Sequence, residues 1–192
     1  MSGRLDPSTE PAGIATILGI KMCEFYNRQF GTNYIVAVPT SVYGPNDDFE
    51  PETAHVLPAL IRRFHEAKIN ASPSVTIWGS GEPCREWLYV DDLVDALVFL
   101  MDNYDSSEMI NIGVGEDLSV KALACLIAEV VGFKGDLVFD ISKPDGARRK
   151  LLDSSRIVKL GWKPKVSLRD GIVRTYGYFC EEYLPSKSKL GR

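Results

Sequence analysis

The chain has 192 residues, of which 45% are apolar and 25% are charged, as in an ordinary folded globular protein. This length suffices for one domain or one and a half, because a folded chain of this size buries about 70% of its unfolded surface. The net charge of −4 excludes a bulk electrostatic attraction to nucleic acid or to an anionic membrane, so we expect neither as a partner.

The N-terminal part of the chain predicts helices that alternate with short strands. Residues 1–11 are rich in Pro, Ser, Thr and Glu, which is typical of a loop. Apolar side chains recur at helical spacing over residues 14–30, and Gly31 follows where a helix commonly ends. Residues 34–39 are continuously apolar, as in a short buried strand. A loop, a helix, a strand and a glycine turn are expected next, at residues 41–52, 55–67, 75–78 and 79–81.

The rest of the chain continues this alternation. Residues 86–90 predict a strand, after which Asp91 and Asp92 can cap a helix that runs to about residue 101. Ser119 is expected to open a helix that Gly132 ends. Two strands, a charged loop, two helices and a frayed tail are the other predicted elements, at residues 109–113, 137–139, 143–150, 154–160, 168–183 and 184–192.

The alternation of strands and helices indicates an α/β fold. Two apolar helix stripes are expected in its core, at Leu93, Leu97, Val98 and Leu100 and at Leu123, Leu126, Ile127 and Val130. A dinucleotide-binding fold also needs a Gly-rich turn, so that a pyrophosphate can reach a helix N-terminus. No G-x-G-x-x-G run occurs in the sequence, and residues 79–81 are interpreted as a tight turn.

The four cysteines lie far apart and form no Cys-x-x-Cys or Cys/His cluster, so we expect no metal site. Their scatter is typical of reduced, unpaired thiols. No apolar run approaches the roughly 18 residues of a membrane span, and the polar N-terminus has no apolar signal region. These observations predict a cytoplasmic protein.

Four sequence blocks together resemble one family. The run VPTSVYGPND at residues 38–47 resembles extended short-chain dehydrogenases. Three further blocks narrow the resemblance to the GDP-L-fucose synthase family, at residues 51–67, 78–86 and 143–153. The resemblance runs from about residue 4 to residue 183, and the blocks are specific in combination.

The resemblance implies a fold and an activity. It implies the C-terminal portion of a Rossmann-like, NAD(P)-binding protein, with an incomplete parallel sheet and a small α/β substrate domain. Its expected parts are an N-terminal loop, a remnant of the dinucleotide-binding domain, a substrate domain and a tail, at residues 1–11, 12–54, 55–183 and 184–192. The family binds NADP and converts GDP-4-keto-6-deoxymannose to GDP-L-fucose by two epimerisations and one reduction.

Two positions depart from the family pattern. The family's reducing step uses a Tyr and a Lys four residues apart, where the Tyr protonates the forming alkoxide and the Lys lowers its pKa. Ala12 and Thr16 stand at these positions, and neither can supply the proton or the charge. Lys21 lies on a different face of the helix and is a poor substitute. Hydride transfer by this chain alone therefore has little basis.

The resemblance also implies site residues. His55 matches the epimerisation acid/base, although a helix N-terminal His bonded to backbone explains the same residue. His65 is expected to be solvated. The loop beside the nicotinamide is implied at Pro39, Thr40, Ser41 and Val42. Nucleotide-sugar contacts are implied at Arg63, Trp78, Arg85, Asp145 and Lys150. The alternatives are surface salt bridges for the arginines, a packing role for the tryptophan and a solvated basic run around Lys150.

Two functions of different classes remain open. The first is an NADP-dependent epimerase/reductase acting on a GDP-sugar. The second is a catalytically silent module that binds a GDP-sugar or serves regulation or oligomerisation. A helix over residues 14–30 with an uncovered apolar face should self-associate, so a homodimer is expected.

Overall fold

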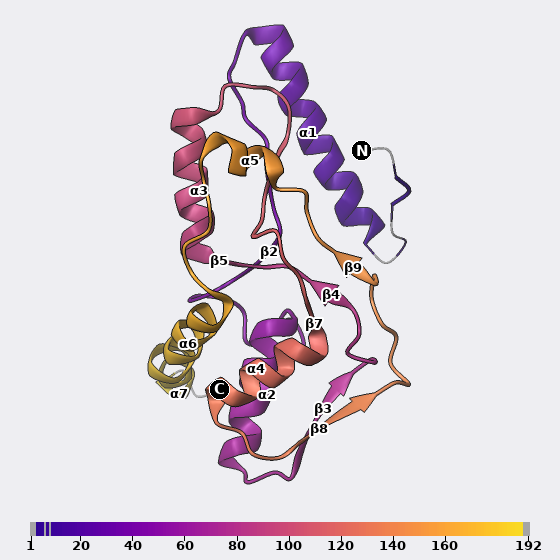
Figure 1. Ribbon diagram of the computed structural model, residues 1–192, viewed down its shortest axis with the longest axis vertical. Helices are drawn as coiled ribbons and strands as arrows, with labels where there is room; N and C mark the ends of the chain where they lie inside the picture. Colours follow the sequence, from indigo (N-terminus) through magenta and orange to yellow (C-terminus); the bar gives the residue numbers. More distant parts are fainter. Residues whose placement is uncertain (1–2, 6, 8, 190–192) are drawn as a thin grey trace.

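The computed structural model describes residues 3–5, 7 and 9–189 and confirms the α/β class. Figure 1 shows an elongated molecule, with α1, α3 and α5 in its upper half and α2, α4, α6 and α7 in its lower half. The helices are α1 Glu10–Phe30, α2 Val56–Ile69, α3 Val90–Asn103, α4 Val120–Val131, α5 Ser155–Leu160, α6 Leu168–Tyr178 and α7 Leu184–Lys189, with a π-helical turn at Phe179–Tyr183 between the last two.

The strands form three parallel pairs and one three-stranded mixed sheet, rather than one wide sheet, in the described part of the chain. They are β1 Ala37–Pro39, β2 Ser41–Tyr43, β3 Ser74–Trp78, β4 Cys84–Arg85, β5 Trp87–Tyr89, β6 Ile110–Ile112, β7 Leu118–Ser119, β8 Asp136–Asp140 and β9 Arg149–Lys150. The parallel pairs are β1 with β6, β2 with β5 and β3 with β8. Strand β4 lies between β7, which is antiparallel to it, and β9, which is parallel. This confirms the incomplete parallel sheet.

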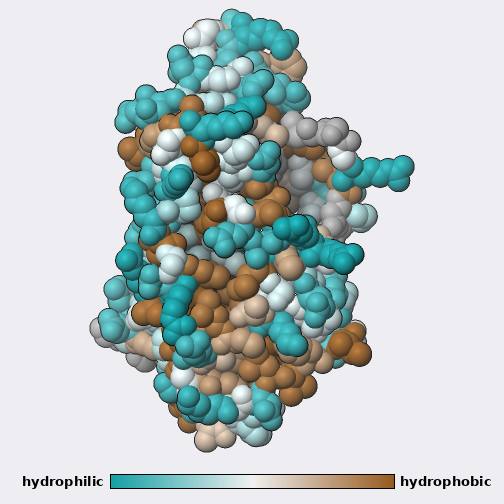
Figure 2. All heavy atoms as spheres, in the orientation of Figure 1, coloured by the Kyte–Doolittle hydropathy of each residue, from teal (hydrophilic) through white to brown (hydrophobic). Residues whose placement is uncertain are grey.

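Two apolar clusters stabilise the two halves. The upper cluster joins β5, α3, β6 and α5, with Leu88, Leu100, Ile110 and Ile157 almost completely buried. The lower and larger cluster joins α2, α4, α6 and β3. Figure 2 shows apolar side chains gathered on the lower half of the visible face, over these elements.

Local sequence explains helix α4 well. The Ser119 hydroxyl accepts a hydrogen bond from the amide of Ala122 at 3.2 Å, which satisfies one of the free donors of the first turn. Gly132 ends the helix in the left-handed conformation. Both ends agree with the sequence prediction. The helix packs Leu123 and Ile127, both fully buried, against the lower core.

Helix α1 forms as expected but remains largely uncovered. Its apolar stripe is more than half exposed at Ile14, Leu18 and Phe25 and half exposed at Met22, while Ile20 is the helix residue that is buried among the described residues. Each exposed large apolar side chain forgoes about 1.5–3 kcal/mol of burial. The prediction of an uncovered apolar face is therefore confirmed.

The termini of the chain differ from the sequence prediction. Helix α1 begins at Glu10 with Pro11 in its first turn, so the predicted loop at residues 1–11 is too long; residues 1–2, 6 and 8 lie outside the described residues. Proline suits a first turn because the missing N–H has no partner there. The predicted frayed tail is wrong for Leu184–Lys189, which is helical, and its last three residues lie outside the described part.

Several internal predictions also need correction. Strand β1 is shorter than predicted, and residues 41–43 form β2 rather than loop because they pair with β5. Asp92 lies inside α3 rather than capping it, and its carboxyl group accepts from the amides of Lys165 and Val166, both at 3.0 Å. Leu97 and Val98 are exposed because the described chain places no element over that face of α3.

Candidate functional site

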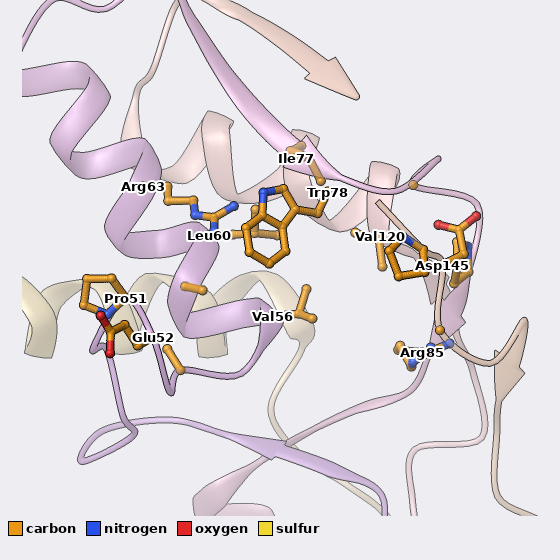
Figure 3. Close-up of a pocket in the computed structure, with 16 residues that line it drawn as sticks. Pro51, Glu52, Val56, Leu60, Arg63, Ile77, Trp78, Arg85, Val120 and Asp145 are labelled. Carbon is orange, nitrogen blue, oxygen red and sulfur yellow. The ribbon is translucent and has the colours of Figure 1, made fainter. Parts of the chain in front are cut away.

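A cavity of about 620 Å³ lies between α2, the end of β3, β4 and the loop after β8. Figure 3 shows Arg63 and Trp78 on one side of it and Arg85 and Asp145 on the other. These are four of the five residues for which the resemblance implied nucleotide-sugar contacts. The lining residues are Pro51, Glu52, Ala54, Val56, Ala59, Leu60, Arg63, Ile77, Trp78, Gly81, Pro83, Arg85, Val120, Pro144, Asp145 and Gly146.

Trp78 presents an open aromatic face at this cavity. Its side chain is 63% exposed, so it is not a core tryptophan. The Arg63 guanidinium lies 5.4 Å from the indole centroid and the Lys143 ammonium lies 5.5 Å from it. Both cations are within the range of a cation–π attraction. The indole therefore holds two positively charged side chains at the cavity wall, and its ring stays exposed.

Asp145 is held by the turn that follows β3. Its carboxylate accepts from the Ser80 amide at 2.9 Å and from the Ser80 hydroxyl at 2.6 Å. These hydrogen bonds keep the pKa of Asp145 below its ordinary value. Gly79 has a φ of 83°, and a Cβ at this position would stand 2.3 Å from the Asp145 carboxylate. The turn predicted at residues 79–81 thus fixes an acidic side chain at the cavity.

The two arginines are available to an anionic ligand. Arg85 donates to the Cys84 carbonyl oxygen at 2.7 Å, and Arg63 donates to the Thr76 carbonyl oxygen at 3.4 Å. Neither forms a salt bridge with a carboxylate of the described residues, so a surface ion pair does not explain them there. A guanidinium whose one hydrogen bond is to a carbonyl oxygen retains several donors for a phosphate.

Other implied residues lie outside the cavity lining. His55 is exposed at the start of α2, between Ala54 and Val56, which both line the cavity. Its side chain makes no helix-capping hydrogen bond. Lys150 is exposed on β9, where its backbone is in register with Arg85. The structure therefore places neither His55 nor Lys150 in the cavity lining, although the two chain neighbours of His55 belong to it.

The implied nicotinamide loop is built from the ends of two strands. The Thr40 amide donates to the Ile112 carbonyl oxygen at 2.9 Å, and the Thr40 hydroxyl lies 3.4 Å from the Glu86 carbonyl oxygen. Pro39 is exposed, and Ser41 and Val42 are partly buried. None of these residues lines the cavity around Trp78. The loop and the cavity are thus separate places, which Glu86 and its neighbours in β4 and β5 connect.

Ala12 and Thr16 lie one turn apart on α1. The Thr16 hydroxyl donates to the Ala12 carbonyl oxygen at 3.0 Å, and both residues are exposed. This is the helical spacing that a Tyr and a Lys need if both are to reach one ligand. The two positions therefore have the spacing that the resemblance implies for a Tyr/Lys pair.

Three residues that lie at or near the site were not predicted from the sequence. Lys143 lies over Trp78, Ser80 holds Asp145, and Glu52 lines the cavity. Lys143 stands at the start of a block that already carried the resemblance, which is a signal that could have found it. His65 is also corrected: it is partly buried, with Nδ1 3.0 Å from the Tyr176 hydroxyl, instead of solvated.

The structure offers neither a metal cluster nor a membrane-spanning helix among its described residues. Within residues 3–5, 7 and 9–189 no group of three or more His, Cys, Asp or Glu side chains is arranged to hold a metal ion. The same residues include no helix with both the length and the apolar content needed to cross a membrane. All four cysteines are free thiols.

Comparison with known proteins gives consistent results. The profile of the NAD dependent epimerase/dehydratase family matches residues 2–113. The chain is 54% identical over 187 residues to probable GDP-L-fucose synthase 1 of Oryza sativa subsp. japonica, covering 97% of this chain and 57% of that protein. It is 48% identical over 190 residues to GDP-L-fucose synthase of Escherichia coli K12, covering 94% and 59%. The chain thus spans less than two thirds of these relatives.

Solved structures agree with the sequence relatives. A GDP-6-OMe-4-keto-L-xylo-heptose reductase from C. jejuni superposes with a TM-score of 0.88 at 36% identity, covering 94% of this chain and 63% of that chain. A GDP-L-fucose synthetase from Naegleria fowleri bound to NADP superposes with a TM-score of 0.79 at 31% identity, covering 89% and 54%.

Proposed function

The chain belongs to the NAD dependent epimerase/dehydratase family, and from this premise we propose that it forms the sugar-nucleotide side of a GDP-L-fucose synthase-like epimerase/reductase. The observation that carries the proposal is the single cavity that Arg63, Trp78, Arg85 and Asp145 share. Relatives named GDP-L-fucose synthase, at 48–54% identity, support a GDP-sugar as the ligand class.

The chemistry of the cavity suits a nucleoside diphosphate-sugar. Two guanidinium groups on facing walls can share the charge of a diphosphate, because their planar forks match phosphate oxygens. The exposed indole of Trp78 offers a flat apolar surface for a base or a sugar ring. The fixed carboxylate of Asp145 offers an acceptor to a base or sugar donor.

His55 is proposed as the proton-transfer group of an epimerisation. An imidazole can exchange a proton with a carbon beside a keto group because its ordinary pKa is near about 6.5. His55 stands between Ala54 and Val56, which line the cavity, and its exposed side chain makes no helix-capping hydrogen bond, which supports the proposal. The test is deuterium exchange at the carbons beside the keto group of GDP-4-keto-6-deoxymannose. We expect His55→Gln to lose this exchange. Unchanged exchange in this variant would contradict it.

The residues of the chain do not fit a complete NADP site. The Thr40 amide and hydroxyl already contact backbone carbonyls, the sequence holds no G-x-G-x-x-G run, and α1 carries Ala12 and Thr16 in place of a Tyr/Lys pair. NADP is therefore proposed for the family, and no hydride step is assigned to this chain. We expect no NADPH oxidation with GDP-4-keto-6-deoxymannose above the rate without protein. Saturable, substrate-dependent NADPH oxidation by the purified chain would contradict this expectation.

Binding of GDP is the direct test of the proposed function. Isothermal titration should show saturable binding, and binding should change the fluorescence of Trp78 because this indole lines the cavity. Arg85→Ala should weaken binding about 10–100-fold, as expected when a charged hydrogen bond is lost. Arg169→Ala is the matched control, because Arg169 is an exposed arginine that pairs with Glu129 away from the cavity. No binding at millimolar GDP would refute the proposal.

A second function, self-association, is favoured by the exposed apolar stripe of α1. Two antiparallel copies of the stripe would cover Ile14, Leu18, Met22 and Phe25 with the same residues of a partner chain, as a two-fold interface allows. A homodimer is therefore proposed. A sedimentation experiment that finds a monomer at high concentration would exclude it. The free thiols fit a reducing compartment, so the cytoplasm remains the expected location.

A further inference from the structure

Glu86 is the most completely buried carboxyl group outside the cavity lining in the described part of the chain, with 0% of its surface exposed. One carboxyl oxygen accepts from the Gly115 amide at 2.8 Å, and the other accepts from the Leu152 amide at 3.1 Å. No Lys, Arg or His of the described residues forms an ion pair with it. A buried carboxyl group without a cation depends on hydrogen bonds to offset its desolvation, so the Gly115 and Leu152 amides should hold it in place.

The two hydrogen bonds connect three segments that lie far apart in the sequence. Glu86 follows β4 and precedes β5. Gly115 belongs to the loop after β6, and Leu152 follows β9, which pairs with β4. The main-chain carbonyl of Glu86 also lies 3.4 Å from the Thr40 hydroxyl. A single residue thus joins the implied nicotinamide loop to the strand that presents Arg85.

The carboxyl group packs closely against Gly113. A Cβ at Gly113 would stand 2.4 Å from a Glu86 carboxyl oxygen and 2.7 Å from the Ser154 hydroxyl, so glycine alone fits there. Adjacent residues of an extended chain point to opposite sides. Arg85 lines the cavity, and the neighbouring Glu86 is buried behind it.

We infer that Glu86 is a positioning residue for the GDP-sugar site: its buried carboxyl group holds β4 against Gly115 and Leu152, and this contact sets where Arg85 stands in the cavity. Glu86 acts through Arg85 and does not touch the ligand. The inference rests on the proposed GDP-sugar function. Arg63 comes from α2, which Glu86 does not contact through either hydrogen bond, so Arg63 should be independent of Glu86.

A double-mutant cycle with GDP as the probe tests the inference. Glu86→Gln replaces one acceptor oxygen by an amide N–H₂ that faces a backbone N–H, and it should weaken GDP binding about tenfold. Combined with Arg85→Ala it should add less than about a twofold loss, because both changes remove the same contact. Combined with Arg63→Ala, the two losses should multiply, because these residues lie on separate elements.

A stability-matched control separates positioning from general destabilisation. Leu100→Ala makes a cavity in the upper core, away from the site, and should lower the unfolding temperature while leaving GDP affinity unchanged. If Glu86→Gln does not fold, Glu86→Asp, which is one methylene too short to reach both amides, takes its place in the cycle.

The outcomes distinguish the inference from the function beneath it. Wild-type chain that binds no GDP refutes the proposed function. Wild-type chain that binds GDP, with Glu86→Gln or its aspartate substitute binding as tightly as Leu100→Ala, refutes the positioning role alone. If the losses of GDP affinity from Glu86→Gln and Arg85→Ala multiply, as those from Glu86→Gln and Arg63→Ala do, the positioning role is also refuted. If the loss from Glu86→Gln adds little to that from Arg85→Ala but multiplies with that from Arg63→Ala, the role is supported.

Discussion

Helices α1 and α4 carry similar sequence signals and meet opposite surroundings. Each has apolar residues at helical spacing, and a left-handed glycine ends each one. Helix α4 buries five residues, whereas α1 buries one. The difference lies in what faces each helix: α2 and α6 cover α4, and no described element covers the stripe of α1. An apolar stripe therefore predicts which face of a helix can be buried, whereas the neighbouring elements decide whether that face is buried.

The largest contrast should appear when one side chain is truncated in each helix. Ile127→Ala should lower the free energy of unfolding by about 2–5 kcal/mol, because Ile127 is fully buried and its loss leaves a cavity. Leu18→Ala should change it by less than about 0.5 kcal/mol, because this side chain is 59% exposed. Urea denaturation measures both. Equal losses would show that α1 is covered in solution, as it would be in a dimer.

The association of α1 can be tested with charge. Leu18→Glu with Met22→Glu places two carboxylates on the exposed stripe and should weaken self-association by at least about tenfold, since carboxylates resist burial. GDP binding should be unchanged, because neither residue lines the cavity. Sedimentation equilibrium gives the association constant. As a control, Val94→Glu with Met101→Glu alters an exposed apolar surface of α3. Equal weakening by both pairs would contradict an interface specific to α1.

The N-cap residues of α4 and α1 should show the same contrast with smaller changes in stability. Ser119→Ala removes the hydroxyl that accepts from the Ala122 amide and should cost about 1 kcal/mol. Thr9→Ala should cost close to nothing, because the Thr9 side chain makes no capping hydrogen bond to α1. Thermal unfolding measures both variants. A Thr9→Ala loss as large as that of Ser119→Ala would show that α1 contributes to the cooperative unit as strongly as α4 does.

The smallest effect on stability should come from mild acid. It should arise at His65 on α2, in the half of the molecule that packs α4. Burial, and secondarily Lys68, lower the pKa of His65, while Glu66 partly opposes them. Above the ordinary value of 6.5 both folded and unfolded chains hold this imidazole neutral. As the pH falls below 6.5 the unfolded chain takes up the proton first, so stability decreases until the folded pKa is passed. The unfolding temperature should therefore be lower at pH 5.5 than at pH 7.5.

His65→Gln provides the control for the acid effect. The chain has two histidines, and neither lies in α1, so this substitution should reduce the difference between the two pH values. Most carboxylates contribute little to it, because their ordinary pKa values of about 4 lie below this range. Burial raises the pKa of Asp47, and this group acts in the opposite direction, because its protonation at lower pH favours the folded chain. An undiminished difference in His65→Gln would assign the acid sensitivity to other groups.

The sequence was most informative where the signal was local. The α/β class follows from the spacing of apolar residues, and Ser119 and Gly132 define α4 because both act on the backbone beside them. Three of the four blocks that carried the resemblance contribute residues to one cavity, at Arg63, Trp78, Arg85 and Asp145. The pattern that misled was the stripe of α3, where Leu97 and Val98 have the spacing of core residues and lie exposed.

The sequence by itself determined the α/β class, most of the helices, and the places where Gly31, Ser119 and Gly132 end or open them. The tertiary structure alone decided which apolar faces are covered, that Lys143 reaches Trp78, and that Glu86 joins Gly115 to Leu152. The physical reason is range. Spacing and caps act within a few residues, whereas burial and these contacts need segments that the chain brings together only on folding.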